Sequence, residues 1–317
     1  MALSSLPHGG CPYNANDPQG CSMLSVARRL LELIRFSHTI FALPFALLSA
    51  LIAWQDERFR RPDLVGIVLC MVFARSAAMA FNRIVDRRFD AANPRTAGRH
   101  LPAGTLGLPA VVLFTILCVL GFVASTLLFY FREPSNPWPL YLSGPVLLFI
   151  GAYSLTKRFT SLAHFWLGAS LMLAPVAAWI AIRGLRDLAT PAVIGLAVLF
   201  WVAGFDVLYA SQDVDFDRSA KLRSIPARWG IRTSLHIALV CHVLMLAMLL
   251  LLYFVCPHLG AIYLIGLAAI AAILTYEHWI VRPDDLSRMN RAFFQVNGAI
   301  SVGLFLLVAL QLAVNSW

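Results

Sequence analysis

The sequence predicts an all-α, polytopic membrane protein in which nine transmembrane helices form a bundle. Apolar residues make up 60% of the 317 residues, charged residues only 13%, and the mean hydropathy is +0.75. Roughly a quarter of a soluble domain is charged. The apolar residues also gather in runs of roughly 20, the length that crosses a bilayer. The charges cluster in the segments between these runs, which disfavours nucleic-acid binding despite the net charge of +9.

The chain begins with a polar segment. Residues 1–24 are rich in Pro, Gly, Asn and Ser, and no short apolar core leads to a signal-peptide cleavage site. We expect a mobile tail here, followed by one nine-helix domain over residues 25–317. The segment SVARRLLELIR (25–35) has the pattern of a basic amphipathic helix on the membrane surface. Of the six cysteines, Cys11 and Cys21 lie in the tail and could pair, and the others are expected to be small buried side chains.

Nine apolar runs are the candidates for membrane-spanning helices. Each is about long enough to cross the hydrocarbon core of a bilayer. They cover residues 36–54, 62–85, 108–131, 138–155, 162–182, 190–212, 234–256, 258–281 and 292–314. Consecutive loops then lie on alternate sides of the membrane.

The basic residues are distributed unevenly between these two sides. Of the 25 Lys and Arg residues, 18 fall in the N-terminal segment and the loops after helices two, four, six and eight. Six fall on the opposite side, and Arg75 lies within a span. The positive-inside rule places the first set in the cytoplasm, so we expect a protein of the cytoplasmic (inner) membrane. The polar loops containing 93–104 and 218–230 both lie on that side, and long polar loops are commonly binding loops.

A polar face ends the second predicted span. Asn82, Asp86 and Asp90 are spaced by four residues, so a helix places all three on one side. Arg75, seven residues before Asn82, shares that side. A carboxylate costs about 2.5–3.5 kcal/mol at the centre of a bilayer and less near its surface. Such residues therefore indicate a functional site.

A second polar face repeats this spacing. The intervals of seven and four residues between Asp206, Asp213 and Asp217 equal those that begin at Arg75, at a constant offset of 131 residues. The repeat suggests an internal duplication, with helices one to four and five to eight as halves. Asp215 would lie on the opposite side of a continuous helix, so we do not expect it to be a primary ligand.

The two faces together predict a magnesium site. Carboxylates that face one cavity repel each other unless a divalent cation neutralises them, and these donors are all Asp or Asn oxygen atoms, which suit Mg²⁺. Arginines and lysines close to both faces suit a diphosphate. Because the site ends an apolar bundle, we expect the diphosphate to carry a lipid tail. Metal and arginines would stabilise the departing diphosphate, and a dry pocket would shield the allylic carbocation from water.

These motifs resemble the UbiA-type intramembrane prenyltransferases. The matching segments are NRIVDRRFD (82–90) with Arg75 upstream, RTAGRHLPAG (95–104), YSLTKRFT (153–160) and DVLYASQDVDFDRSAKLRSIPARWG (206–230). The likeness covers residues 35 to 317, and the two Asp-rich motifs are highly specific only as a pair. In detail they look most like the branch that modifies 4-hydroxybenzoate in quinone biosynthesis. That branch includes look-alikes that act on a dihydroxynaphthoate in menaquinone formation.

The resemblance implies Mg²⁺-dependent transfer of a prenyl group from a polyprenyl diphosphate to an aromatic acid. The residues that it implies for Mg²⁺ are Asn82, Asp86, Asp90, Asp213 and Asp217. With Asp206, these four aspartates are the implied catalytic residues. The residues that it implies for the diphosphate and the surrounding face are Arg75, Arg95, Arg99, Tyr153, Lys157, Tyr209, Lys221 and Arg223. Arg158 is the candidate for the carboxylate of the acceptor.

Other interpretations stay open. An ion-coupled transporter also uses intramembrane acids and repeats, but it predicts charges near the midplane and broken helices, whereas these acids crowd one interface. A scaffold protein leaves the repeated Asp spacing unexplained. Lys157 and Arg158 could simply be positive-inside anchors, and Tyr153 could belong to the interfacial aromatic belt. His164 is expected to be a packed residue.

Overall fold

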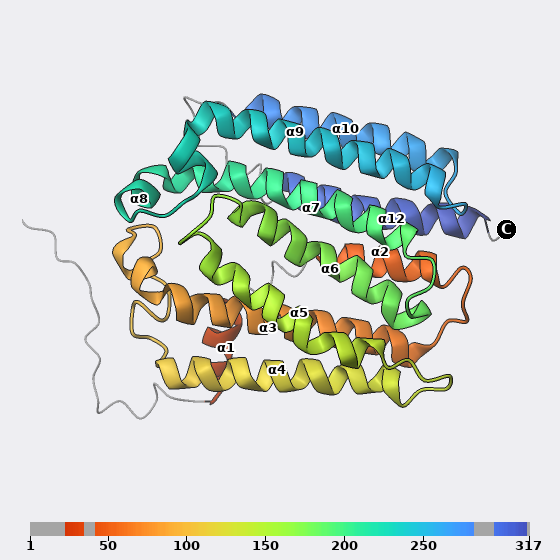
Figure 1. Ribbon diagram of the computed structural model, residues 1–317, viewed down its shortest axis with the longest axis horizontal. Helices are drawn as coiled ribbons and strands as arrows, with labels where there is room; N and C mark the ends of the chain where they lie inside the picture. The colour runs from red at the N-terminus through yellow and green to blue at the C-terminus, as the bar shows by residue number, and fades with distance from the viewer. Residues whose placement is uncertain (1–22, 35–41, 282–294, 316–317) are drawn as a thin grey trace, which may run out of the picture.

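A computed structural model describes residues 23–34, 42–281 and 295–315, and it is helical throughout. Long helices lie side by side, with α8 at the end away from the C-terminus (Figure 1). In chain order the elements are α1 (Met23–Leu33), α2 (Leu43–Ala53), α3 (Arg61–Ala92), α4 (Leu108–Tyr130), α5 (Trp138–Thr156), α6 (Ala163–Arg183), α7 (Ala189–Ala210), the 3₁₀ turn η2 (Ser211–Asp213), α8 (Val214–Ser219), α9 (Ile225–Val255), α10 (Ala261–Ile280) and α12 (Asn297–Asn315).

Eight helical segments of the described chain are long and apolar enough to cross a membrane. They are α3, α4, α5, α6, the run Ala189–Ser219, α9, α10 and α12. The first predicted span, 36–54, is represented by the 11-residue α2, and residues 35–41 lie outside the described residues. The structure therefore confirms a polytopic helical bundle with eight candidate spans in the described residues, and the ninth span stays a prediction.

Two helices extend beyond the predicted spans. The second span was predicted to end at residue 85, but α3 continues to Ala92 because the polar motif belongs to the same helix. The seventh span was predicted to start at residue 234, but α9 starts at Ile225, where the Ser224 side chain accepts a hydrogen bond from the backbone of Ala227. Gly230, at φ 81°, then kinks α9. Hydropathy locates the membrane-crossing part of a helix, not its ends.

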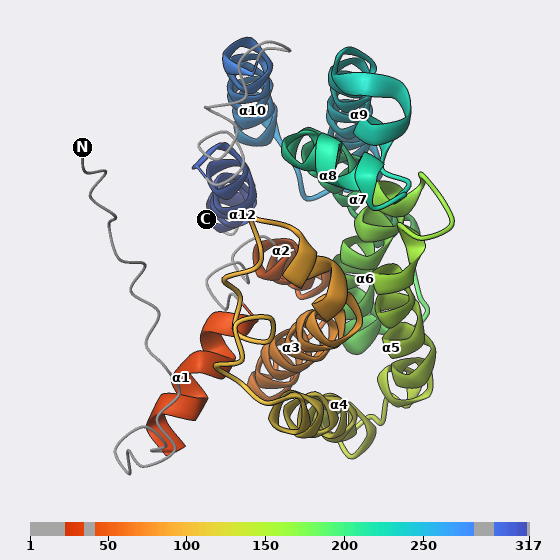
Figure 2. The same cartoon turned by 90° about the vertical axis from the view of Figure 1, so that its left-hand side faces the viewer.

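The helix ends that carry both polar faces lie at one end of the bundle, which we call the motif end. α3, α5 and α7 finish there, and α6, α9 and α12 begin there; Figure 2 views the bundle from this end. The predicted tail, 1–24, lies outside the described residues except for its last two, which begin α1.

α7 forms the centre of the bundle. In its most apolar 18-residue window 67% of the residues are buried, a larger share than in any other candidate span of the described chain. Glycines allow close packing on both sides: a Cβ on Gly168 would lie 2.4 Å from the Leu199 carbonyl oxygen, and one on Gly204 would lie 2.6 Å from the His242 ring. Large apolar residues such as Leu148, on α5, point outwards, as lipid contact requires.

The predicted amphipathic helix is present as α1, although Arg35 lies outside the described residues. Leu33 packs in one apolar cluster with Ala80 of α3 and Leu106. Arg29 donates a hydrogen bond of 2.9 Å to the Thr105 carbonyl oxygen. α1 therefore packs against the segment that joins α3 to α4.

Candidate functional site

The first polar face lies on one unbroken helix, as predicted. Asn82 donates a hydrogen bond of 2.9 Å to Asp86 Oδ2 within α3. One turn later, the buried Asp90 accepts a hydrogen bond of 2.6 Å from Arg99 Nη1, and Arg83 Nη1 lies 3.7 Å from its other oxygen. Two arginines thus compensate the most buried carboxylate of this face.

The second polar face does not lie on one helix. α7 ends at Ala210, a 3₁₀ turn carries the chain to Asp213, and α8 begins a new axis. Asp217 is buried, with 4% of its surface exposed, whereas Asp215 is exposed. Asp215 and Asp217 therefore differ in burial, and a break in the helix, rather than the far side of a straight helix, accompanies this difference. That Asp215 is not a primary ligand stays a prediction.

Arg95 connects the two faces. It lies in the segment after α3 and binds Asp213 with two hydrogen bonds, one of them 2.8 Å between Nε and Oδ1. Its Nη1 donates to the Tyr209 hydroxyl at 3.0 Å, and its guanidinium carbon lies 5.3 Å from the Tyr209 ring centre. Burial alone would lower the pKa of Arg95, but the hydrogen bond and charge of Asp213 raise it. A permanent cation thus joins α3 to η2.

Lys157 and Asp206 form the inner part of the site. Burial alone would lower the pKa of the Lys157 ammonium, but its interactions with Tyr153 and with the carboxylates of Asp206 and Asp217 raise it above its ordinary value. Asp206 Oδ2 lies 2.6 Å from His164 Nδ1. Lys157, which directly follows α5, therefore lies within the electrostatic influence of Asp206 on α7 and Asp217 on α8.

The other predicted cations have different surroundings. Arg75 is half-buried in α3, and its Nε makes no hydrogen bond to the described residues. Arg223 donates from its side chain to the Phe159 carbonyl oxygen, and Lys221 is exposed at φ 56°. Arg223 thus links the turn after α8 to the segment after α5, and Lys221 lies within that turn. Among the described residues neither forms an ion pair with the acids, so their contact with phosphate stays a prediction.

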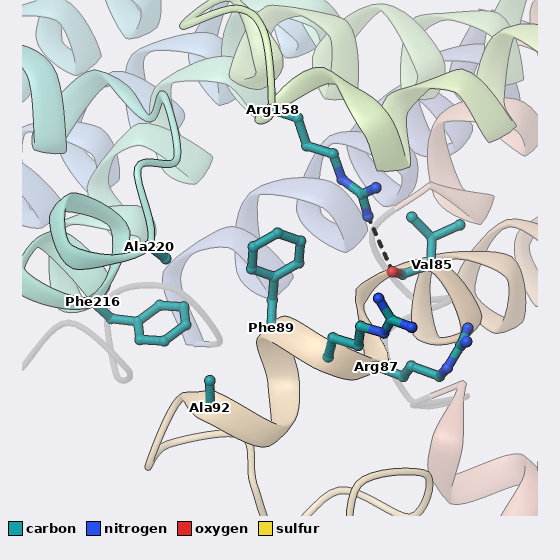
Figure 3. A pocket seen from close by; sticks show the side chains of 8 residues that line it. Val85, Arg87, Phe89, Ala92, Arg158, Phe216 and Ala220 are labelled. Carbon is teal, nitrogen blue, oxygen red and sulfur yellow. Dashed lines mark hydrogen bonds between the residues drawn. The ribbon is translucent and has the colours of Figure 1, made fainter.

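A pocket of about 760 Å³ opens beside the first face, lined by Val85, Arg87, Arg88, Phe89, Ala92, Arg158, Phe216 and Ala220 (Figure 3). Arg158 reaches across it from the end of α5, donates to the Val85 carbonyl oxygen at 3.0 Å, and lies 3.5 Å from Asp86 Oδ1. Its guanidinium carbon is 5.3 Å from the Phe89 ring centre. Phe89 and Phe216 were not singled out in the sequence, although each directly precedes an aspartate of a motif.

The acids fit a magnesium ion by their chemistry but are not assembled around one position. Within residues 23–34, 42–281 and 295–315, no three His, Cys, Asp or Glu side chains are arranged to hold a metal ion. Asp86, Asp90 and Asp213 each pair with arginine. One buried oxygen of Asp90 and one of Asp217 nevertheless accept no hydrogen bond from the described residues. These are hard oxygen donors of the kind that Mg²⁺ prefers.

Comparison with known proteins gives a consistent set of relatives. The sequence profile of the UbiA prenyltransferase family matches residues 42–309. A 4-hydroxybenzoate octaprenyltransferase of Marinobacter nauticus is 32% identical over 79% of this chain and 82% of its own length. The enzyme of the same name from Tolumonas auensis is 33% identical over 75% of this chain and 79% of its own length.

Solved structures show the same architecture. The apo structure of a UbiA homologue from Aeropyrum pernix superposes with a TM-score of 0.77, at 30% identity, over 89% of this chain and 98% of that protein. A UbiA homologue from Archaeoglobus fulgidus, solved with DMAPP and Mg²⁺, has a TM-score of 0.70 at 17% identity, over 90% and 99% of the two chains. The second likeness concerns the fold alone.

Proposed function

The chain belongs to the UbiA prenyltransferase family, and we propose that it transfers a polyprenyl group from a polyprenyl diphosphate to the ring of 4-hydroxybenzoate. One observation carries the proposal: acidic faces from distant parts of the chain meet at one end of a membrane bundle, joined by Arg95 and Asp213. The relatives that act on 4-hydroxybenzoate support the choice of acceptor. The product belongs to quinone biosynthesis.

The oxygen donors of both faces would hold Mg²⁺, the ion present in two structures of a homologue. They are Asn82, Asp86, Asp90, Asp213 and Asp217. When bound, the ion neutralises charge on the diphosphate and on its departing form. The arginines that now pair with the acids would turn to the phosphate oxygens, since guanidinium binds phosphate and carboxylate in the same two-pronged geometry.

The protein's own residues would perform the remaining tasks. Lys157 and Arg75 would contact the diphosphate from inside the bundle, with Lys221 and Arg223 as further cations from the turn after α8. The C1–O bond of the prenyl diphosphate breaks, and its electron pair leaves with the diphosphate. A ring carbon next to the acceptor hydroxyl, the position that the hydroxyl activates, then bonds to C1, and the ring loses a proton. Apolar helices exclude the water that would otherwise trap the cation.

The pocket beside Asp86 suits the acceptor. Arg158 offers a guanidinium group to a carboxylate, and Phe89 and Phe216 offer ring faces and edges to an aromatic ring. Because Arg158 also lies near Asp86, the acceptor would be held next to the acids of the first face. A dihydroxynaphthoate presents the same two groups and is the alternative acceptor.

The charge distribution supports a cytoplasmic position for the motif end in the inner membrane, because loops rich in Lys and Arg stay on that side. The substrates would then be reached from the cytoplasm, and the prenyl tail from the bilayer. Labelling of single cysteines introduced at exposed positions of the two ends, with a reagent that does not cross membranes, tests this orientation.

The decisive experiment uses purified protein with Mg²⁺, a series of polyprenyl diphosphates, and either 4-hydroxybenzoate or a dihydroxynaphthoate. Product masses identify the acceptor and the preferred chain length together. We expect prenylated 4-hydroxybenzoate, and no product when the Mg²⁺ is chelated. Product from the naphthoate alone would replace the proposed acceptor, and ion uptake into vesicles without any transfer would favour a transporter.

A further inference from the structure

One imidazole joins three helices at the motif end. His164, the second residue of α6, is fully buried, with 0% of its surface exposed. Its Nδ1 lies 2.6 Å from Asp206 Oδ2 on α7, and its Nε2 lies 3.3 Å from the backbone nitrogen of Ile225, the first residue of α9. Both ring nitrogens are therefore used inside the protein.

These two contacts determine where the proton of the ring lies. The backbone N–H of Ile225 can only donate, so Nε2 must offer its lone pair. The ring must then carry its proton on Nδ1, and this N–H donates a hydrogen bond to the Asp206 carboxylate. An imidazolium would place an Nε2–H against the Ile225 N–H, and two buried donors would face each other. His164 is thus neutral and protonated on Nδ1.

The same contacts fix two neighbouring parts of the site. One carboxylate oxygen of Asp206 is held by His164, which restricts the direction of the other oxygen. Ile225 begins α9 directly after the turn that contains Lys221 and Arg223. The backbone of that turn returns to α5, because Arg223 N donates to the Lys157 carbonyl oxygen at 2.8 Å.

We propose that His164 is a positioning residue: as the neutral Nδ1–H imidazole it orients the Asp206 carboxylate on α7 and holds the start of α9 beside it. It exchanges no proton with either substrate, because both of its nitrogens are occupied. The inference rests on the proposed function for the role of Asp206, but the protonation of His164 does not depend on that function.

The test uses two substitutions, each of which preserves one of the two hydrogen bonds of the imidazole. His164→Asn places an amide N–H near the position of Nδ1 and preserves the donor to Asp206. His164→Gln places an amide oxygen near the position of Nε2 and preserves the acceptor for Ile225. His164→Leu removes both. His236→Asn and His236→Gln, at an exposed position of α9, are the matched controls.

Two measurements are made on the full chain in detergent or nanodiscs. Nitrogen-15 spectra of histidine-labelled protein, with the His164 signals identified by their loss in His164→Asn, should show a protonated Nδ1 and a bare Nε2. In the transfer assay, kcat should fall roughly 10–100-fold in His164→Gln and His164→Leu, the usual effect of removing a residue that orients another, and about threefold or less in His164→Asn. KM for the acceptor should not change.

The outcomes separate this inference from the proposed function. Protonation on Nε2, a charged imidazolium, or equal kcat losses in His164→Asn and His164→Gln at equal thermal stability would overturn it, because a packing role treats the two variants alike. If the wild-type protein transfers no prenyl group to any acceptor, the proposed function fails, and the nitrogen-15 spectra still decide the protonation of His164.

Discussion

The two acidic faces have the same residue spacing but different construction. The first lies on the continuous helix α3, and Asp90 is compensated by Arg83 and Arg99, which come from α3 and the segment just after it. The second is divided between α7, a 3₁₀ turn and α8, and Asp213 takes its arginine from the segment after α3.

The difference shows that equal spacing does not require equal backbone geometry. In α3 the helical repeat aligns the acids. In the second face the contact with Arg95 holds Asp213, and the break before α8 accompanies the burial of Asp217. The first face therefore depends on local helix geometry, and the second depends on contacts between distant segments.

The largest expected effect tests whether both faces serve one site. Asp86→Asn and Asp213→Asn should each lower kcat by roughly 10²–10³-fold, since each removes a charge that would support the departing diphosphate. Circular dichroism and gel filtration should match the unmodified protein. Near-normal turnover in both variants would remove the acids from the site.

A smaller effect concerns the second face alone. Asp217→Asn should reduce turnover about 100-fold, because the buried oxygen without a hydrogen bond is available for a cation. Asp215→Asn should change it less than about threefold, because Asp215 is exposed. The reverse ranking, measured under the same conditions, would contradict the assignment of inward and outward acids.

The next effect concerns the pocket beside the first face, the proposed site of the acceptor. Arg158→Ala should raise KM for the aromatic acid roughly tenfold or more, since a hydrogen bond to a charged group contributes about 1.5–3 kcal/mol. KM for the prenyl diphosphate should stay within about twofold. Arg232→Ala, at an exposed site on α9, is the control. Equal increases in both KM values would assign Arg158 to the phosphate.

Arg95 and Arg99 should differ in how strongly they compete with Mg²⁺ for the carboxylates that they bind. Arg95→Gln removes the side-chain cation on Asp213 and should raise the affinity for Mg²⁺ without diphosphate about fivefold, because a partly exposed ion pair contributes about 1 kcal/mol. Arg99→Gln should change it less, since Asp90 keeps Arg83. Thermal-shift titration with Mg²⁺ measures both. No difference between the variants would mean that the arginines do not compete with the metal.

The smallest expected effect is the absence of a pH dependence. The raised pKa of Lys157 keeps its ammonium charged until the pH passes above about 10.4, the value for a free lysine. KM for the prenyl diphosphate should therefore stay constant between about pH 7 and 9.5 and be higher throughout in Lys157→Met. A rise in KM over this range that is absent from Lys157→Met would show that Lys157 loses its proton early.

The sequence predicted the membrane bundle and the first face because both depend on local patterns. Runs of apolar residues located the spans, and the four-residue spacing placed Asn82, Asp86 and Asp90 on one helix. The break at Ser211–Asp213 contains no Gly or Pro, so no local sequence signal predicted that the helix would break there. The partner of Asp213 could not be predicted either, because Arg95 lies 118 residues away.

Side chains without charge were the least predictable part of the site. Phe89 of α3 and Phe216 of α8 line one pocket together with Arg158, an arrangement that no spacing rule describes. His164 was expected to be packed, and it is buried, but its two hydrogen bonds depend on the positions of α7 and α9. Whether the two halves arose by duplication stays a prediction.

The link between Arg95 and Asp213 has a consequence for protein engineering. If the chain were divided in the turn between α5 and α6, the first fragment would carry the arginine and the second its carboxylate. Chimeras that combine fragments of two relatives would then need a matched pair at these positions, together with a compatible partner for Tyr209. The fragments are therefore not interchangeable modules, and library design should recombine the residues at 95, 209 and 213 as one unit.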